Sequence, residues 1–497
     1  MRYYSSNNPQ HQVDFKTAIL TGLAPDQGLY LPCSIPQFPT DFWKDSQFES
    51  AWQLASAMLY PYVKEFFTPQ DFADLLQDCL SFDFPLHPMG NDYVLELFHG
   101  PTLAFKDVGA RFLARCMSKL SDRKHTILVA TSGDTGSAVA QGFYKMPHVD
   151  VVILYPKNRI SPTQEKQLTT VGENVVAVEI DGSFDQCQAL VKQAFLDQDL
   201  CKARPLSSAN SINIARWLPQ SIYYAWSVHQ VASQVSFCVP SGNYGNLAAG
   251  TLAMSMGMPC APWIVASNAN DVVPQYLQQG QFLPHASRTT LSNAMDVGNP
   301  SNFTRLQHLF NPYALCNHHM SYDQNYSPSH MSNLAQVPPT LSQVHSGDQM
   351  SDDHVSGDQD HATWLKMRQS MYGYAVTDSQ TIDGIQAVYN QYHYMIDPHT
   401  AVAYHAVQQH KDALHTGSTQ KHTSNPSGTM KDKEDLSYVI LATASPAKFS
   451  EVMTQAIQQS PPVPTRLQKI IQRVGKKVSL SAEYEMLKNY LIDSNLS

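Results

Sequence analysis

Short apolar runs that alternate with helical stretches between residues 125 and 275 constrain the fold of this chain more than any other feature. Helical periodicity, as in Asp185–Leu196, separates these runs. The alternation predicts α/β layers around a mainly parallel sheet, with ligands at the loops outside the carboxyl ends of the strands. The five runs of strand length are Ile127–Ala130, Val149–Tyr155, Asn174–Ile180, Val235–Val239 and Trp263–Ala266.

Two of these runs end in glycine-rich turns that lead directly into helical stretches. The first turn is Thr131–Gly136 and the second is Pro240–Asn246. A turn of this kind offers backbone N–H groups and the positive end of a helix dipole to an anion. Neither turn has the P-loop pattern or the dinucleotide-binding glycine pattern, so a nucleotide is not the first expectation.

Lys106 is the candidate reactive residue. It follows a turn at Gly100-Pro101 and precedes Val108–Met117, whose apolar residues have helical spacing, so it lies where a loop enters a helix. The helix dipole and desolvation both disfavour an ammonium group at that position. A lysine that is partly neutral can form a Schiff base with an aldehyde cofactor.

The composition excludes several classes of function. Charged residues make up 15% of the 497 residues, and the net charge of −9 offers no basic surface for nucleic acid. No apolar run is long enough to span a membrane and residues 1–10 are polar, so we expect no membrane partner and a cytoplasmic location. The eight cysteines are scattered without a CxxC pair, so we expect neither disulfides nor a zinc site.

We divide the chain into four regions. Residues 1–92 form an aromatic-rich, helical N-terminal region, and residues 93–310 form the α/β core, which we expect to consist of two sub-domains. Residues 311–362 are a polar, loop-like insertion whose six histidines lack regular metal-ligand spacing, so we expect no metal there. Residues 363–497 complete the core and carry a second polar insertion at about 410–435.

The loop around Lys106 and both glycine-rich turns resemble the threonine synthase family. The matching segments are Pro101–Asp107, Ala130–Gly136 and Pro240–Asn246. The resemblance, to the longer class found in enteric bacteria and fungi, implies a fold type II (tryptophan synthase β-like) pyridoxal-phosphate enzyme with mainly parallel sheets flanked by helices. Six further blocks match in the same order along the chain, namely Phe15–Pro32, Asn210–Gln220, Ala266–Pro274, Ala294–Phe303, Asp397–Val402 and Ala442–Phe449.

The resemblance also implies a cofactor site. Pyridoxal 5'-phosphate would form its Schiff base with Lys106, and Thr443 matches the family position whose hydroxyl faces the pyridine nitrogen. A neutral hydroxyl leaves that nitrogen unprotonated, which makes the cofactor a milder electron sink. The family usually has histidine where Ser445 stands. The cofactor phosphate would lie in the loop formed by Gly242, Asn243, Tyr244, Gly245 and Asn246.

The reaction that the resemblance implies converts O-phospho-L-homoserine and water to L-threonine and phosphate, the last step of threonine biosynthesis. This makes the chain a carbon–oxygen lyase that acts on a phosphate, as a monomer or homodimer. Asn210, Ser211 and Arg216 would hold the substrate phosphate, which suits the arginine fork. Ser132, Gly133, Asp134 and Thr135 would hold the substrate carboxylate, and we expect the Asp134 side chain to cap backbone N–H groups.

Two other readings of the sequence remain open. The first is another fold type II lyase, such as a serine/threonine dehydratase or a phospho-lyase. Arg216 distinguishes a dehydratase from threonine synthase, because a dehydratase does not need a residue that binds a substrate phosphate. The second is a cofactor-binding or phosphate-binding protein without catalysis. Loss of Lys106 or of the Gly242–Asn246 loop would favour that second reading, and the sequence retains both.

Overall fold

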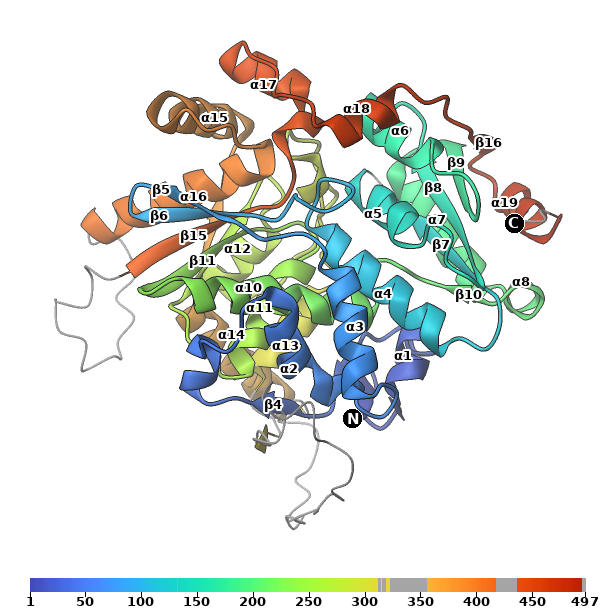
Figure 1. The fold of residues 1–497 in the computed structure, drawn as a ribbon, viewed down its shortest axis with the longest axis horizontal. Helices are drawn as coiled ribbons and strands as arrows, with labels where there is room; N and C mark the ends of the chain where they lie inside the picture. The colour runs from blue at the N-terminus through green and yellow to red at the C-terminus, as the bar shows by residue number, and fades with distance from the viewer. Residues whose placement is uncertain (132, 312–313, 315–318, 322–354, 417–435, 494–497) are drawn as a thin grey trace.

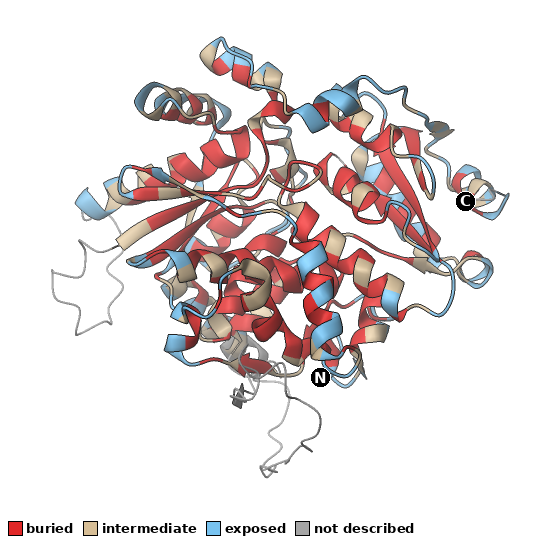
Figure 2. Ribbon diagram, in the orientation of Figure 1, coloured by how far each residue is buried: buried red, intermediate tan, exposed pale blue. Residues whose placement is uncertain are grey.

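Two β-sheets with helices on their faces make up the centre of the computed structural model (Figure 1). The structure describes residues 1–497 except residues 132, 312–313, 315–318, 322–354, 417–435 and 494–497. Figure 2 shows that the inner strands of both sheets are buried along most of their length. None of the described helices is both long enough and apolar enough to cross a membrane.

The sheet on the right of Figure 1 is parallel throughout. Its strands, in spatial order, are β10 (Leu206–Ser207), β7 (His125–Ala130), β8 (Val149–Pro156), β9 (Val175–Asp181) and β16 (Val478–Ser481). β8 is buried at every residue, which explains why its sequence is a nearly continuous apolar run. The helices of this half are α5 (Asp134–Gly142), α6 (Pro162–Thr169), α7 (Phe184–Leu196), α8 (Gln198–Ala203) and α19 (Tyr484–Asp493).

The second sheet is parallel except at one edge, where β5 runs antiparallel to β6. In spatial order its strands are β14 (Met371–Ala375), β12 (Trp263–Ser267), β11 (Gln234–Pro240), β15 (Leu436–Ala442), β6 (Asp92–Glu96) and β5 (Leu86–Met89). Its helices are α10 (Ser221–Gln230), α11 (Gly245–Ser255), α12 (Val272–Gln279), α13 (Phe303–Phe310), α14 (Val355–Ser370), α15 (Asp378–Tyr392), α16 (Pro398–Thr416) and α17 (Ser450–Ile457).

The predicted strands are confirmed to within two residues at each end, but they divide between the two sheets. β7, β8 and β9 belong to the first sheet, whereas β11 and β12 belong to the second. The sequence pattern fixes which segments become strands. Strand partners depend on contacts between distant segments, such as the parallel pairing of β15 with β6.

The N-terminal region contains strands as well as the predicted helices. β1 (Tyr3–Ser5) pairs antiparallel with β2 (Gln12–Val13) and β3 (Tyr30–Pro32), and β4 (Ile35–Gln37) pairs with β13 (His319–Ser321). Tyr3, Tyr4 and Tyr30 are buried in this small sheet, as aromatic residues in strands commonly are. The helices of the region are α1 (Phe15–Thr21), α2 (Ala51–Val63) and α3 (Pro69–Cys79).

Helix α4 (Lys106–Leu120) packs against α5 from the first sheet and against the short helix α9 (Ile214–Trp217). It therefore lies where the two halves of the molecule meet. The C-terminal segment crosses between the halves as well. It leaves β15, passes through α17 and α18 (Thr465–Ile471), and adds β16 to the edge of β9.

Helices replace the loop structure predicted at the borders of both polar insertions. α14 begins at Val355, and beyond it Met367 is buried and the Trp364 indole N–H donates to the Tyr276 carbonyl at 3.0 Å. α16 continues to Thr416, and His410 on it is buried. The polar composition hid these contacts, because few apolar residues anchor each helix end. Residues 312–313, 315–318, 322–354 and 417–435 of the predicted insertions lie outside the described residues.

Candidate active site

Two loops that follow neighbouring strands hold Lys106. β6 and β15 pair in parallel, so the loops after them leave the same end of the sheet. The Phe105 N–H donates to the Thr443 carbonyl at 2.9 Å, and the Ser445 N–H donates to the Leu103 carbonyl at 3.0 Å. This ladder sets Lys106, the first residue of α4, beside the loop that carries Thr443.

The amine of Lys106 is a weaker base than an ordinary lysine. It faces a cavity, and desolvation there lowers its pKa to about 8, with the positive charges of Lys448 and Arg216 contributing in the same direction. The carboxylate of Asp134 acts in the opposite direction and raises the pKa of Lys106. An appreciable fraction of this amine is therefore uncharged near neutral pH, as the sequence predicts.

The second glycine-rich turn follows β11 and leads into α11. A side chain at Gly242 would place its Cβ 2.8 Å from the Ala294 carbonyl oxygen and from the Met295 Cα, so only glycine fits there. Tyr244 has a φ of 60° and makes the turn into the helix, which begins at Gly245. The turn is thus held against residues 294–295 at the N-terminus of a helix, the arrangement that binds anions.

Asn246 presents a donor to the same cavity. Its side-chain oxygen accepts hydrogen bonds from the hydroxyls of Tyr223 at 2.5 Å and Tyr224 at 2.7 Å. These two bonds fix the amide, and its nitrogen Nδ2 is buried with no hydrogen-bond partner among the described residues. An orphaned donor at the start of a helix indicates that an acceptor from outside the chain belongs there.

Arg216 is a buried cation without a carboxylate partner in the described part of the chain. Its side chain is 2% exposed, its Nη1 donates to the Ala209 carbonyl at 2.5 Å, and its Nε has no hydrogen-bond partner among the described residues. Desolvation lowers the pKa of its guanidinium to about 10. Because Arg216 also lines the cavity, its unused donors are available to an anion.

Arg305 is a second buried arginine, which the sequence reasoning missed. Its guanidinium donates to the carbonyls of Ser211 at 3.0 Å and Ile212 at 2.6 Å and to Asn302 Oδ1 at 2.5 Å, and it stacks on Trp217. Desolvation lowers the pKa of this guanidinium to about 9. Arg305 therefore supports the loop that carries Ser211, and a lone arginine within a helical stretch gave no signal of that role.

The first glycine-rich turn differs from its prediction at Asp134. Its carboxylate lies 2.5 Å from Lys448 Nζ and accepts from Gln164 Nε2 at 3.1 Å, so the expected cap of backbone N–H groups is replaced by side-chain partners. Lys448 explains this outcome, since a buried carboxylate prefers a cation to amide dipoles. Thr135 lines the cavity. Gly133 has a φ of 150°, and Ser132 lies outside the described residues.

One cavity of about 400 Å³ brings most of the predicted residues together. Gly133 and Asp134 are absent from its lining, although Asp134 acts on Lys106 through its charge. The predicted residues that line the cavity are Lys106, Thr135, Asn210, Ser211, Arg216, Gly242, Asn243, Tyr244, Gly245, Asn246 and Thr443.

His399 also lines the cavity, although the sequence reasoning assigned it no role. Its Nδ1 lies 2.7 Å from Asp397 Oδ1, and its Nε2 accepts the Ala294 N–H at 3.2 Å. These contacts join the start of α16 to the segment that supports Gly242. The block Asp397–Val402, noted above only for its resemblance, was the signal that could have identified this residue.

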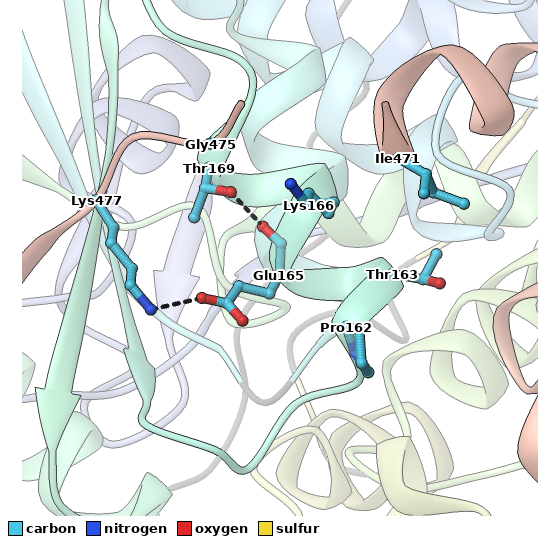
Figure 3. A pocket seen from close by; sticks show the side chains of 8 residues that line it. All are labelled: Pro162, Thr163, Glu165, Lys166, Thr169, Ile471, Gly475 and Lys477. Carbon is cyan, nitrogen blue, oxygen red and sulfur yellow. Dashed lines mark hydrogen bonds and ion pairs between the residues drawn. The ribbon is translucent and has the colours of Figure 1, made fainter. Parts of the chain in front are cut away.

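A second cavity, of about 310 Å³, lies between α6 and the segment that carries Ile471, Gly475 and Lys477 (Figure 3). Lys477 Nζ donates to Glu165 at 2.8 Å and to Glu179 at 2.6 Å, and Lys166 Nζ donates to a backbone carbonyl at 2.9 Å. The charged groups of this cavity are thus satisfied by other groups of the protein, so we assign no ligand to it.

Comparisons with known proteins identify the family to which this chain is similar. The chain matches the family models described as pyridoxal-phosphate dependent enzyme (residues 93–309), threonine synthase N terminus (2–80) and threonine synthase, C-terminal (424–491). Threonine synthase from Haemophilus influenzae is 36% identical over 99% of this chain and all of that protein.

Solved structures give the same result over the whole chain. The crystal structure of threonine synthase from Escherichia coli matches with a TM-score of 0.79 at 34% identity, over 99% of this chain and 100% of that one. The structure of PLP-bound threonine synthase from Brucella melitensis matches with a TM-score of 0.80 at 32% identity, over 99% of both chains. With this similarity along nearly its whole length, the chain belongs to the threonine synthase family of pyridoxal-phosphate-dependent enzymes.

Proposed function

We propose that this chain converts O-phospho-L-homoserine and water to L-threonine and phosphate. One observation carries the proposal, namely that a single cavity holds a lysine of weakened basicity and two separate groups of unused anion-binding donors. One group lies at the Gly242–Asn246 turn and the other is Arg216. The first fits a phosphorylated cofactor, and the second fits a substrate that carries a phosphate of its own.

The residues present fit pyridoxal phosphate. The glycine-rich turn at the start of α11, with the partnerless Asn246 Nδ2, would hold the phosphate. Lys106 would hold the aldehyde carbon, and Thr443 would lie at the pyridine nitrogen. When bound, the cofactor withdraws electrons from the substrate carbon that bears the amino group.

The substrate would be oriented at both of its ends. Arg216, with Asn210 and Ser211 in the preceding loop, would bind the phosphate by charge-assisted hydrogen bonds. Thr135 at the N-terminus of α5 would bind the carboxylate, with Gly133 and Ser132 in the same turn. Asp134 is engaged by Lys448, so in this proposal it acts on the site through its charge rather than as a substrate ligand.

Lys106 would move the protons. An amine whose pKa is about 8 can accept a proton from the substrate carbons and return one near neutral pH. In the overall reaction, the bond from Cγ to the phosphate oxygen breaks and Cγ gains a proton. Cβ gives up a proton and takes the hydroxyl of water, and the remaining proton leaves with the phosphate. Arg216 would neutralise the charge on the departing phosphate.

We further propose that the protein works in the cytoplasm as a monomer or homodimer, with a small molecule as its substrate. The negative net charge and the absence of a membrane-spanning helix among the described helices support this setting. Size-exclusion chromatography with light scattering would distinguish the two oligomeric states.

Amino-acid analysis after incubation with O-phospho-L-homoserine tests the proposed reaction. We expect L-threonine and phosphate in equal amounts. A keto acid with ammonia in place of threonine would instead identify a dehydratase or phospho-lyase.

Borohydride reduction of the holoenzyme, followed by peptide mapping, should attach the cofactor to Lys106. A label on Lys448, the other lysine near the site, would contradict the assignment.

A further inference from the structure

Asp134 and Lys448 form a buried ion pair next to the proposed reactive lysine. Lys448 Nζ lies 2.5 Å from Asp134 Oδ1, and the two side chains are 0% and 4% exposed, respectively. Lys448 also donates to the Thr102 carbonyl at 3.1 Å, in the loop that leads to Lys106. The pair is thus enclosed by protein on all sides.

The pair joins the two halves of the molecule. Asp134 begins α5, directly beyond the first sheet's strand β7, whereas Lys448 ends a short turn beyond the second sheet's strand β15. Two glutamines on α6 extend the contact. Gln164 Nε2 donates to Asp134 at 3.1 Å, and Gln167 Nε2 donates to the Thr102 carbonyl at 3.1 Å.

A buried ion pair rarely stabilises a protein more than well-packed apolar residues would, so its contribution to folding alone does not explain its presence. The position of the pair relative to Lys106 gives another explanation for its presence. The charges that act on this amine are the carboxylate of Asp134, which favours the ammonium form, and the cations Lys448 and Arg216, which oppose it. Without Lys448, Asp134 would be a bare buried anion beside Lys106.

We propose that Lys448 is a positioning residue for catalysis, which cancels the charge of Asp134 and thereby keeps the amine of Lys106 available in its uncharged form. The inference rests on the proposed function, in which Lys106 exchanges protons with the substrate. Asp134 in turn offsets the positive charge of Lys448, which would otherwise lower the pKa of Lys106 further. The two members of the pair therefore have opposite effects on the pKa of Lys106. Loss of either member should shift that pKa.

Three variants test this balance through changes of opposite sign. Lys448→Met leaves Asp134 uncompensated, so the pKa of Lys106 should rise by on the order of one pH unit. Asp134→Asn removes the carboxylate that pairs with Lys448, whose charge still interacts with that of Asp107, and should lower the pKa of Lys106. The double variant removes both charges and should return close to the original value. A pair with a purely structural role would give loss of stability without opposite shifts.

Two readouts measure the shift. In the full-length holoenzyme, the visible absorbance of the bound cofactor is titrated against pH, a measurement that needs neither substrate nor turnover. In the full chain freed of cofactor, the pH dependence of Lys106 acetylation by acetic anhydride, followed by mass spectrometry, reports the pKa of the amine directly. Opposite shifts with cancellation in the double variant support the proposal, and equal or absent shifts overturn it.

Two controls separate the proposal from misfolding and from the proposed function. Lys448→Arg keeps the charge and should keep the titration of the original protein, so it remains informative if Lys448→Met does not fold. Lys477→Met removes a cation that pairs with Glu179 and does not line the cavity of Lys106. It should leave the pH titration of the cofactor absorbance unchanged. If no threonine forms but the opposite shifts appear, the proposed reaction fails while the charge balance stands.

Discussion

Buried cations at the centre of this molecule have partners of different kinds. The Arg305 guanidinium donates to carbonyl and amide oxygens of the chain, and Lys448 contacts a carboxylate and a carbonyl. Among the described residues, the Nε of Arg216 and the Nε of Arg305 both lack a hydrogen-bond partner, but Arg216 lines the cavity and Arg305 does not. Because burying an unpaired charge is costly, Arg216 is the cation whose position is best explained by a bound anion.

Arg216→Met keeps the bulk of the side chain and removes its charge. We expect kcat/KM for O-phospho-L-homoserine to fall by about one to two decades, because a charge-assisted contact to phosphate contributes roughly 1.5–3 kcal/mol. The absorbance of the bound cofactor should be retained. Steady-state kinetics, with unphosphorylated serine or threonine as the comparison substrate, measure the effect.

Arg305→Met is the matched control for Arg216. It removes a buried guanidinium of the same size, but leaves the carbonyls of Ser211 and Ile212 without donors, so it should lower the thermal midpoint of unfolding. The assignment of Arg216 to the substrate phosphate would be wrong if Arg216→Met reduced the rates on phosphorylated and unphosphorylated substrates equally.

At the scale of single elements, two helices near the C-terminal end show how burial overrides a polar sequence. α16 packs along β11, β12 and β15, and it carries the polar residue His410 inside the protein. α19 packs on α7 and buries Leu487 and Leu491 against the outer face of the first sheet. α16 buries residues along most of its length, whereas α19 is held by Leu487 and Leu491, and single substitutions test one contact in each helix.

His410 makes the protein sensitive to acid. Its burial lowers the pKa of the imidazole to about 4, and Nδ1 lies 2.9 Å from the Tyr374 hydroxyl. A histidine has a pKa of about 6.5 in the unfolded chain, so its contribution to stability is present above that pH. It is lost as the pH falls from about 6.5 toward about 4, by roughly 2–3 kcal/mol.

Urea unfolding at pH 7 and at pH 4.5 checks this contribution. His410→Gln keeps a polar group but does not titrate, so its stability should fall less between the two pH values than that of the original protein. His415→Gln, an exposed position on the same helix, should leave the difference unchanged. Equal acid sensitivity of the original protein and His410→Gln would refute the prediction.

Leu487→Ala tests how α19 is attached. Leu487 is fully buried, and its truncation should reduce the free energy of unfolding by about 2–5 kcal/mol. Met486→Ala, at the neighbouring exposed position, should change it by less than about 0.5 kcal/mol. Chemical denaturation of both variants provides the comparison. If both changed stability alike, α19 would not be anchored by its buried face.

At the scale of the whole molecule, the active site depends on segments from both halves. The cavity takes Thr135 and Phe184 from helices of the first sheet, Asn246 from α11 and Thr443 from the loop after β15 of the second sheet. The C-terminal segment connects the halves a second time, because β16 joins β9 at the edge of the first sheet.

Replacing residues 322–354 with a short glycine–serine linker should leave folding and turnover nearly intact. This stretch is polar and lacks the apolar periodicity needed to build a core, and a shorter loop costs little to close. A longer deletion through Ser370 is the contrasting variant, because it removes α14 with the buried Met367 and should lower stability. Circular dichroism melts and threonine assays compare the two. Loss of activity in a folded short-deletion variant would show that residues 322–354 have a catalytic role.

The sequence by itself determined the local structure and the identity of the main residues. Periodicity located β7, β8, β9, β11 and β12, and the family resemblance carried by the glycine-rich turns and the loop around Lys106 implied the cofactor. These features depend on residues that are close along the chain, so a single sequence carries them.

Only the tertiary structure decided which distant groups act together. It divided the predicted strands between two sheets and placed Lys448 against Asp134 rather than leaving that carboxylate to cap a helix. It also brought in Arg305 and His399, whose roles arise from loops far away in sequence. Burial and charge pairing of this kind depend on the three-dimensional surroundings of a side chain, and local spacing does not encode those surroundings.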